Sequence, residues 1–197
     1  MNTKLTFAIA ATVLGTLNTV PYIINIFRHK TTPHSYSWLV WTILQITGAL
    51  AMLGGGAGGI GVVYLSVGAV LCLFVLLLSL RYGTKNITAF DKVCLVGALT
   101  ATAIWFFLRQ PLLSVIFVAV IDFVAFLPTF RKAYEEPCSE TVSMYFLSGV
   151  AQLLALVALS AYNVSTTLYL IALAITNMVF TTMVLLRRAR LSSSLPK

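Results

Sequence analysis

The sequence predicts an all-α integral membrane protein with seven transmembrane helices, arranged as two parallel three-helix bundles joined by a linker helix. Three observations support this prediction: the composition, seven apolar stretches with a one-sided distribution of charge, and an internal repeat. Of the 197 residues, 59% are hydrophobic and 9% are charged, against about 25% charged in an ordinary soluble domain. So few polar residues could not cover the surface of a soluble enzyme, and a disordered chain would need low hydrophobicity and high charge.

A helix that crosses a bilayer needs about 20 mostly apolar residues. The stretches of this kind are residues 5–27, 36–54, 59–81, 91–108, 111–130, 141–162 and 165–187. The first helix is expected to be retained and not cleaved as a signal peptide, because further apolar spans follow it instead of a soluble body.

The first three helices are separated by residues that stop helices. The basic residues of 28–30 end the first stretch, and the glycine-rich segment 54–59 separates the second from the third. Glycine loses much backbone entropy in a helix, so this segment is expected to be a loop. Residues 81–83, Arg-Tyr-Gly, end the third stretch.

The later breaks are of the same kind. Residues 109–111 separate the fourth stretch from the fifth, and Pro111 is well placed to begin a helix. Residues 131–132 end the fifth stretch, residues 162–163 separate the sixth from the seventh, and residues 187–188 end the seventh.

The net charge of +8 predicts the orientation. One side of the predicted bundle carries only Lys4 and Arg109 among the basic residues. The other side carries the remaining eleven of the thirteen: Arg28, Lys30, Arg81, Lys85, Lys92, Arg131, Lys132, Arg187, Arg188, Arg190 and Lys197. Basic loops stay in the cytoplasm. The chain is therefore expected in a cell membrane (plasma or inner), with its N-terminus outside and its C-terminus in the cytoplasm. The charge therefore does not indicate nucleic-acid binding.

The chain resembles itself at an offset of 107 residues. This offset places Pro21 on Pro128, Phe27 on Tyr134, Trp38 on Tyr145, Gln45 on Gln152 and Arg81 on Arg188. The match predicts a first three-helix repeat over 1–83, a linker helix over 84–109, a second repeat over 110–190 and a cytoplasmic tail over 191–197. A single linker span gives both repeats the same orientation, which is a transporter architecture.

The motifs of both repeats resemble the PQ-loop superfamily, which includes the SWEET and SemiSWEET sugar transporters and the cystinosin-like exporters. Pro21-Tyr22 with residues 28–38, and Pro128-Thr129 with residues 131–143, carry this resemblance. Tyr22 and Thr129 stand where the family has its glutamine. The resemblance implies transport of a small solute by alternating access. Bacterial nicotinamide riboside carriers share a similar three-one-three plan, so the fold does not name the substrate.

Pro21 and Pro128 are candidate hinges. Proline within a helix removes one backbone hydrogen bond and clashes with the preceding turn. Each of these prolines follows several residues of apolar helix, so each could bend its helix during alternating access. A static kink, or a helix end near the headgroups, is the alternative.

Asp122 is the strongest single candidate site residue, because it is the only carboxylate deep within a predicted span. A charged aspartate at the centre of a bilayer costs at least about 2.5 kcal/mol, so it should face a cavity or a partner. We expect a proton-coupling group or a contact for a substrate. The alternative is a protonated structural acid bonded to a neighbouring hydroxyl. Its repeat equivalent is Gly15, so the repeats differ here.

Four amides mark a candidate substrate site within the spans. They are Asn18, Gln45, Gln152 and Asn177. An amide in hydrocarbon needs a partner, so these side chains should point into the bundle. Asn177 resembles the asparagine that flanks the sugar in SWEET-like proteins. For the two glutamines, hydrogen bonding between helices is an equal alternative.

Trp41 and Tyr145 are aromatic candidates for stacking on a substrate ring. The alternative for such residues is the aromatic belt at the membrane surface, which we favour for Trp38. His29 and His34 are expected in a solvated loop. We expect the loop acids Glu135, Glu136 and Glu140 to be able to pair with Arg131 or Lys132, forming a gate between the two halves.

The sequence thus predicts a transporter or facilitator for a small polar solute such as a sugar, an amino acid or a vitamin-like compound. Proton coupling through Asp122 is part of this hypothesis. The alternative is a seven-helix ligand-binding receptor or scaffold of the same fold that transports nothing. Motifs for an enzyme, a cofactor or a metal site are absent from the sequence. The expected partners are the lipid bilayer and the solute, with protons and a second copy of the chain as further candidates.

Overall fold

The computed structural model describes residues 3–54, 60–107, 110–159, 162 and 164–193. Every regular element in these ranges is a helix. The elements are α1 (Thr3–Leu17), α2 (Thr19–Phe27), α3 (Ser35–Gly54), α4 (Ile60–Tyr82), α5 (Ala89–Phe107), α6 (Pro111–Glu135), the short 3₁₀ helix η1 (Pro137–Ser139), α7 (Val142–Ala158) and α8 (Val164–Ser193). The prediction of an all-helical chain is confirmed for these residues.

The helices follow the apolar stretches of the sequence closely. Helices α1 and α2 together cover the first predicted stretch, and each of α3 to α8 covers one of the others. Parts of three predicted breaks, residues 55–59, 109 and 163, lie outside the described residues. Helix α8 continues through the arginines of 187–190 as far as Ser193, so these basic residues do not end the helix.

Within the described residues, four helical segments are long and apolar enough to cross a membrane. They are Thr3–Phe27, Ala89–Phe107, Leu112–Glu135 and Thr167–Ser192. Shorter apolar helical segments occur at Ser66–Tyr82 and Val142–Ala158.

The surface of the helices is unusually apolar, and the interior holds charged groups. On α5, Val93 is 69% exposed and Phe107 is 80% exposed. Meanwhile Asn18 is 4% exposed, and Lys132 and Glu140 are 0% and 2% exposed. A soluble helix shows the opposite pattern, with its polar face toward water.

The chain divides into two compact units. The first unit contains residues 1–31 and 129–197, and the second contains residues 32–128. The chain therefore passes between the units twice, once in the loop before α3 and once within α6 at Pro128. These units group the helices differently from the predicted repeats, and the repeat itself remains a prediction from sequence.

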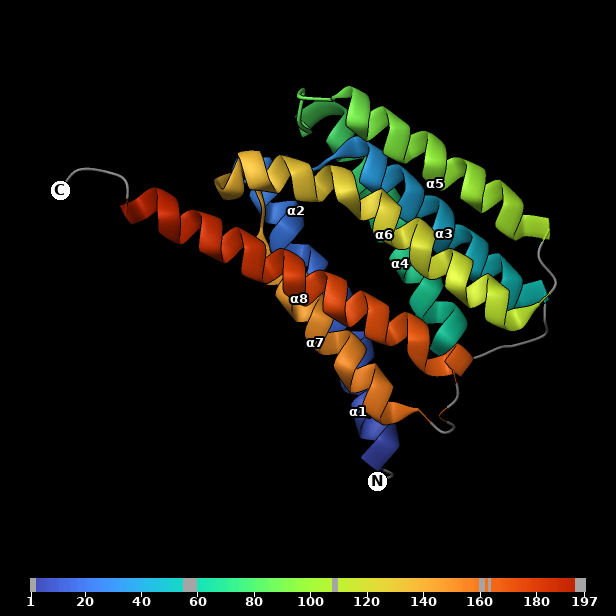
Figure 1. Ribbon diagram of the computed structural model, residues 1–197. Coiled ribbons are helices and arrows are strands. Elements are labelled where there is room, and N and C mark those ends of the chain that lie inside the picture. Colours follow the sequence, from blue (N-terminus) through green and yellow to red (C-terminus); the bar gives the residue numbers. More distant parts are fainter. Residues whose placement is uncertain (1–2, 55–59, 108–109, 160–161, 163, 194–197) are drawn as a thin grey trace. The chain divides into compact units, whose positions relative to one another are not determined.

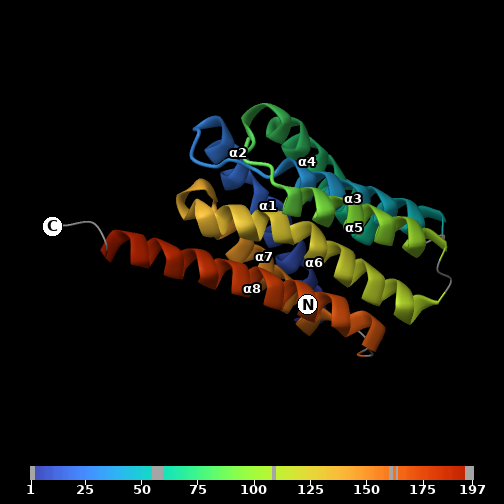
Figure 2. The same ribbon diagram turned by 45° about the horizontal axis from the view of Figure 1, so that its top comes forward.

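In the first unit, α7 packs against both α1 and α8 (Figures 1 and 2). The contacts between α7 and α8 show that the two helices run antiparallel, since Tyr145 lies against Phe180 while Gly149 lies against Asn177. In addition, α2 contacts α7, and η1 contacts the C-terminal part of α8.

In the second unit, α3 packs against α4 and α5. Its core is a cluster of buried aliphatic residues from α3, α5 and α6: Val40, Ala98, Ile121 and Ala125. The N-terminal part of α6 thus belongs to this unit, while the part after Pro128 belongs to the first unit.

Candidate functional site

The first predicted span is interrupted at Asn18, between α1 and α2. Asn18 keeps helical backbone angles (φ −62°, ψ −23°), so the interruption is a gap in the hydrogen-bond ladder and not a loop. Pro21 explains its position, because proline lacks the N–H that would bond the carbonyl of Leu17, four residues earlier. The disturbance of the helix that was predicted for Pro21 is therefore a gap in the backbone hydrogen bonds, and it lies one turn before the proline.

The side chain of Asn18 ties this interruption to α7. Its Nδ2 donates to Ser148 Oγ at 2.6 Å and to the carbonyl oxygen of Met144 at 3.3 Å. Its Oδ1 accepts from Thr19 Oγ1 at 3.2 Å. The amide thus points into the first unit, as the sequence predicts for an amide in an apolar helix.

Asn177 reaches the same helix from the other side. Its Cβ lies 3.4 Å from the point where a Cβ on Gly149 would be, and the end of Met178 lies 2.5 Å from that point. Gly149 thus allows α8 to approach α7 closely. Asn177 is 8% exposed, and its Nδ2 donates to the carbonyl oxygen of Leu173 at 3.0 Å.

Two buried side-chain oxygens in this unit have no hydrogen-bond partner among the described residues. They are Oε1 of Gln152 on α7 and Oγ1 of Thr181 on α8. A buried acceptor or hydroxyl without a partner costs about 1–3 kcal/mol, so each such group in a native protein needs an explanation.

Thr181 is not among the site residues predicted from the sequence. A threonine inside an apolar helix gives little signal, because its hydroxyl usually bonds the carbonyl four residues earlier. The available signal was position: Thr181 follows Asn177 by four residues and therefore lies on the same face of α8.

Tyr145 is buried, and its ring is covered on several sides. The ring centroid lies 4.3 Å from that of Phe180 and 6.2 Å from that of Tyr22. Its hydroxyl donates to Oε2 of Glu140 at 3.1 Å. In this conformation Tyr145 positions a carboxylate, and its ring face is already occupied by protein.

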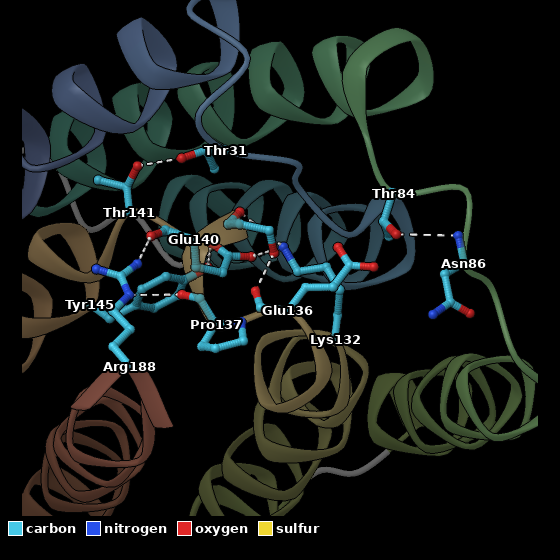
Figure 3. Close-up of polar contacts among 11 residues, drawn as sticks. Thr31, Thr84, Asn86, Lys132, Glu136, Pro137, Glu140, Thr141, Tyr145 and Arg188 are labelled. Atoms are coloured by element: carbon cyan, nitrogen blue, oxygen red, sulfur yellow. Dashed lines mark hydrogen bonds and ion pairs between the residues drawn. The ribbon is translucent and has the colours of Figure 1, made fainter. Parts of the chain in front are cut away.

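Glu140 forms a buried ion pair with Lys132 (Figure 3). Lys132 Nζ lies 2.5 Å from Glu140 Oε1, both side chains have no exposed surface, and Nζ also donates to the carbonyl oxygen of Ser139 at 3.3 Å. Arg131 pairs with Glu135 at 2.7 Å, but in a more exposed position. The predicted pairing is confirmed for Glu135 and Glu140. The partners of each pair belong to the first unit, so the gate between the halves stays a prediction.

Arg188 holds the loop that carries Glu140 (Figure 3). Its Nε donates to the carbonyl oxygen of Pro137 at 2.8 Å, and its Nη2 donates to that of Glu140 at 2.6 Å. The bidentate guanidinium thus fixes both ends of η1. Since Glu140 bonds Tyr145 and Lys132, the arginine also positions the buried pair.

The second unit contains a similar contact at the equivalent place. At the offset of 107 residues, Pro33 corresponds to Glu140, and its carbonyl oxygen accepts a hydrogen bond from Thr84 N at 3.1 Å, just after α4. A Cβ on Gly83 would lie 2.7 Å from this oxygen and 2.1 Å from the carbonyl oxygen of Ser79. Gly83 is therefore needed for the close approach of the two segments.

Three predicted site residues lie in the second unit. Trp41 lies edge-on to Trp38 and to Phe126, with ring centroids 5.2 Å apart in each case, and it packs on the aliphatic core. Gln45 on α3 faces Gly68 on α4, since its Nε2 lies 2.9 Å from the point where a Cβ on Gly68 would be. Trp38 is 2% exposed, which does not fit the predicted position in an aromatic belt.

Asp122 is the third predicted site residue in the second unit. It is half-buried on α6, beside the core residues Ile121 and Ala125. Its carboxyl group interacts electrostatically with the thiol of Cys72 on α4. The described part of the chain offers its carboxyl group no hydrogen bond or ion pair. Whether Asp122 couples protons stays a prediction.

Pro128 is buried inside α6, which continues through it to Glu135. The boundary between the two compact units falls at this residue. A proline at this point removes the hydrogen bond to the carbonyl of Val124 and weakens the helix there.

The prediction of a solvated loop is wrong for His34, although His29 is exposed. His34 has no exposed surface, and its Nε2 lies 3.5 Å from Oδ2 of Asp91. Asp91 also caps α5: its Oδ2 accepts from Thr88 N at 2.7 Å, and Asp91 N donates to Thr88 Oγ1 at 3.3 Å. This reciprocal capping box holds the carboxylate where the histidine can meet it.

The structure thus places three of the predicted site residues, Asn18, Tyr145 and Asn177, on or against the same part of α7 in the first unit, and Gln152 lies further along this helix. Comparison with known proteins finds no matching family model, no matching curated protein and no matching solved structure.

Proposed function

We propose that the chain is a multi-pass membrane protein that transports a small polar solute, such as a sugar, an amino acid or a vitamin-like compound. The proposed membrane topology has seven spans with the C-terminus in the cytoplasm. Exposed apolar side chains on long helices support the membrane placement, because lipid is the solvent that favours such a surface.

The observation that carries the proposal is the polar site around α7, with its two unpartnered oxygens on Gln152 and Thr181. A solute with hydroxyl or amide groups could bond both of them. Asn18 lies at an interrupted helix, a feature of substrate sites in transporters, and its amide already reaches α7.

Alternating access between two three-helix halves is the proposed mechanism. Residues 31–32 and 128–129 join the two compact units, which differ from the three-helix halves predicted from the sequence. Pro128 is the candidate hinge at residues 128–129, because α6 has one backbone hydrogen bond fewer at this proline. Asp122 is the candidate proton-coupling residue.

A seven-helix ligand-binding receptor or scaffold of the same fold, without transport, is the alternative. Such a receptor would need an uncompensated basic group deep in the bundle. Lys132 is buried, but Glu140 neutralises it at 2.5 Å, and this pairing argues against the alternative.

A ligand-stabilisation screen of the purified protein tests the proposal. Sugars, amino acids, nucleosides and vitamins are added at two pH values, and the melting temperature is measured. One class is expected to raise the melting temperature of the wild-type protein. Absence of a shift with every class would contradict the proposal.

The variant Thr181→Val locates the site. It removes one unpartnered hydroxyl, so the protein should fold normally, while affinity for the solute should fall by up to roughly tenfold, as expected for one lost hydrogen bond. Thr47→Val is the matched control, since the Thr47 hydroxyl bonds the carbonyl of Ile43 at 2.7 Å. An equal loss of affinity in both variants would mean that the site lies elsewhere.

A further inference from the structure

A groove of about 490 Å³ lies on the first unit, along the C-terminal half of α8 and the end of α6. Its lining includes Tyr134, Val179, Met183, Leu186, Arg187 and Arg190. Met178 lines this groove and also lies against Gly149 at the polar site around α7, while the other lining residues are separate from that site.

The two ends of the groove differ in chemistry. Val179 and Leu186 are 54% and 56% exposed, so this part presents an open apolar channel. Arg187 and Arg190 stand at the other end. From Met178 to Arg190 the helix rises about 18 Å, close to the roughly 15 Å of hydrocarbon in one leaflet of a bilayer.

Arg187 is held in place at the charged end. Its Nε donates to the carbonyl oxygen of Tyr134 at 3.1 Å, and its guanidinium lies 4.3 Å from the centroid of the Tyr134 ring. Within the described residues, its two Nη nitrogens have no hydrogen-bond partner. A guanidinium fixed in this way can bind a phosphate with both nitrogens.

We propose that this groove binds one anionic phospholipid, with the phosphate at Arg187 and Arg190 and an acyl chain along Val179, Met183 and Leu186. The proposal rests on the membrane placement given above, and it does not require transport. The excess of basic residues puts this end of α8 in the cytoplasmic leaflet, which carries anionic lipids, and each basic residue near such a surface strengthens binding.

Native mass spectrometry of the purified protein tests this proposal, with phosphatidylglycerol and phosphatidylcholine of identical acyl chains as probes. The wild-type protein should retain phosphatidylglycerol in preference. The variants Arg187→Gln and Arg190→Gln should each weaken its binding roughly fivefold. Arg28→Gln, which removes an exposed charge on the same predicted side, is the matched control and should change nothing.

The variant Val179→Trp tests the apolar part while leaving both arginines in place. It should displace the lipid by filling the channel, and the exposed position makes normal folding the expected result. Inorganic phosphate should not compete with the lipid.

Equal loss in Arg28→Gln, full binding in Val179→Trp, or displacement by inorganic phosphate would each overturn the proposal. Lipid retention is measured without any solute, so a failure of the lipid-binding proposal would leave the transport proposal standing. A failure of transport would likewise leave this result unchanged.

Discussion

Removing one partner of the buried pair Lys132–Glu140 should destabilise the protein strongly. In Lys132→Met, the carboxylate of Glu140 keeps the hydroxyl of Tyr145 at 3.1 Å but loses its cation at 2.5 Å. Both side chains have no exposed surface, so water cannot replace the lost partner. Stranding a buried charge in this way costs about 3–5 kcal/mol in free energy of unfolding.

The double variant Lys132→Met/Glu140→Gln should recover most of this loss. It removes both charges, and replacing a buried pair by neutral groups is often close to neutral in stability. Arg131→Met is the matched control on the neighbouring residue. Its pair with Glu135 is partly exposed, at 14% and 45%, and should contribute about 0–1 kcal/mol.

These free energies of unfolding are measured in mixed micelles by raising the concentration of a denaturing detergent. Circular dichroism follows the loss of helix. The prediction is a large loss in Lys132→Met that the second substitution reverses. If Lys132→Met cost no more than Arg131→Met, or if the two substitutions at the buried pair were additive, the reasoning would be refuted.

Three further predictions concern the second unit. Gly83→Ala should lower the free energy of unfolding by about 1–3 kcal/mol, because the new Cβ would lie 2.7 Å from the carbonyl oxygen of Pro33. Gly97→Ala is the matched control. Its nearest atom lies 4.0 Å from the new Cβ, so this variant should be neutral or slightly stabilising. Asp91→Asn should cost about 1–2 kcal/mol in the same measurement, through the weakened cap of α5. Asp122→Asn should abolish the pH dependence of solute uptake into vesicles, and unchanged uptake at every pH would remove Asp122 from the coupling mechanism.

The helices were well predicted because their signal is local. Apolar stretches of about 20 residues and the basic or glycine-rich breaks between them follow directly from the sequence. The inward direction of Asn18 also followed from physics, since an amide in an apolar helix must find a partner.

The partners of the buried polar groups could not be predicted in the same way, because they depend on which helices meet. His34 was expected in solvent, yet it meets Asp91 across the loop that joins α4 to α5. The capping box formed by Thr88 and Asp91 was a readable signal for the start of α5, but nothing local linked it to His34. Thr181 was not predicted for the same reason, since the burial of its hydroxyl depends on how α8 packs within the first unit.

Flux of the solute through reconstituted vesicles tests the central claim most directly. The solute that stabilises the purified protein is placed on one side of the membrane, and its saturable exchange is followed in the wild-type protein and in Thr181→Val. We expect saturable flux in the wild-type protein and a reduced apparent affinity in the variant. Saturable binding of the solute without any flux would contradict transport and would favour a receptor.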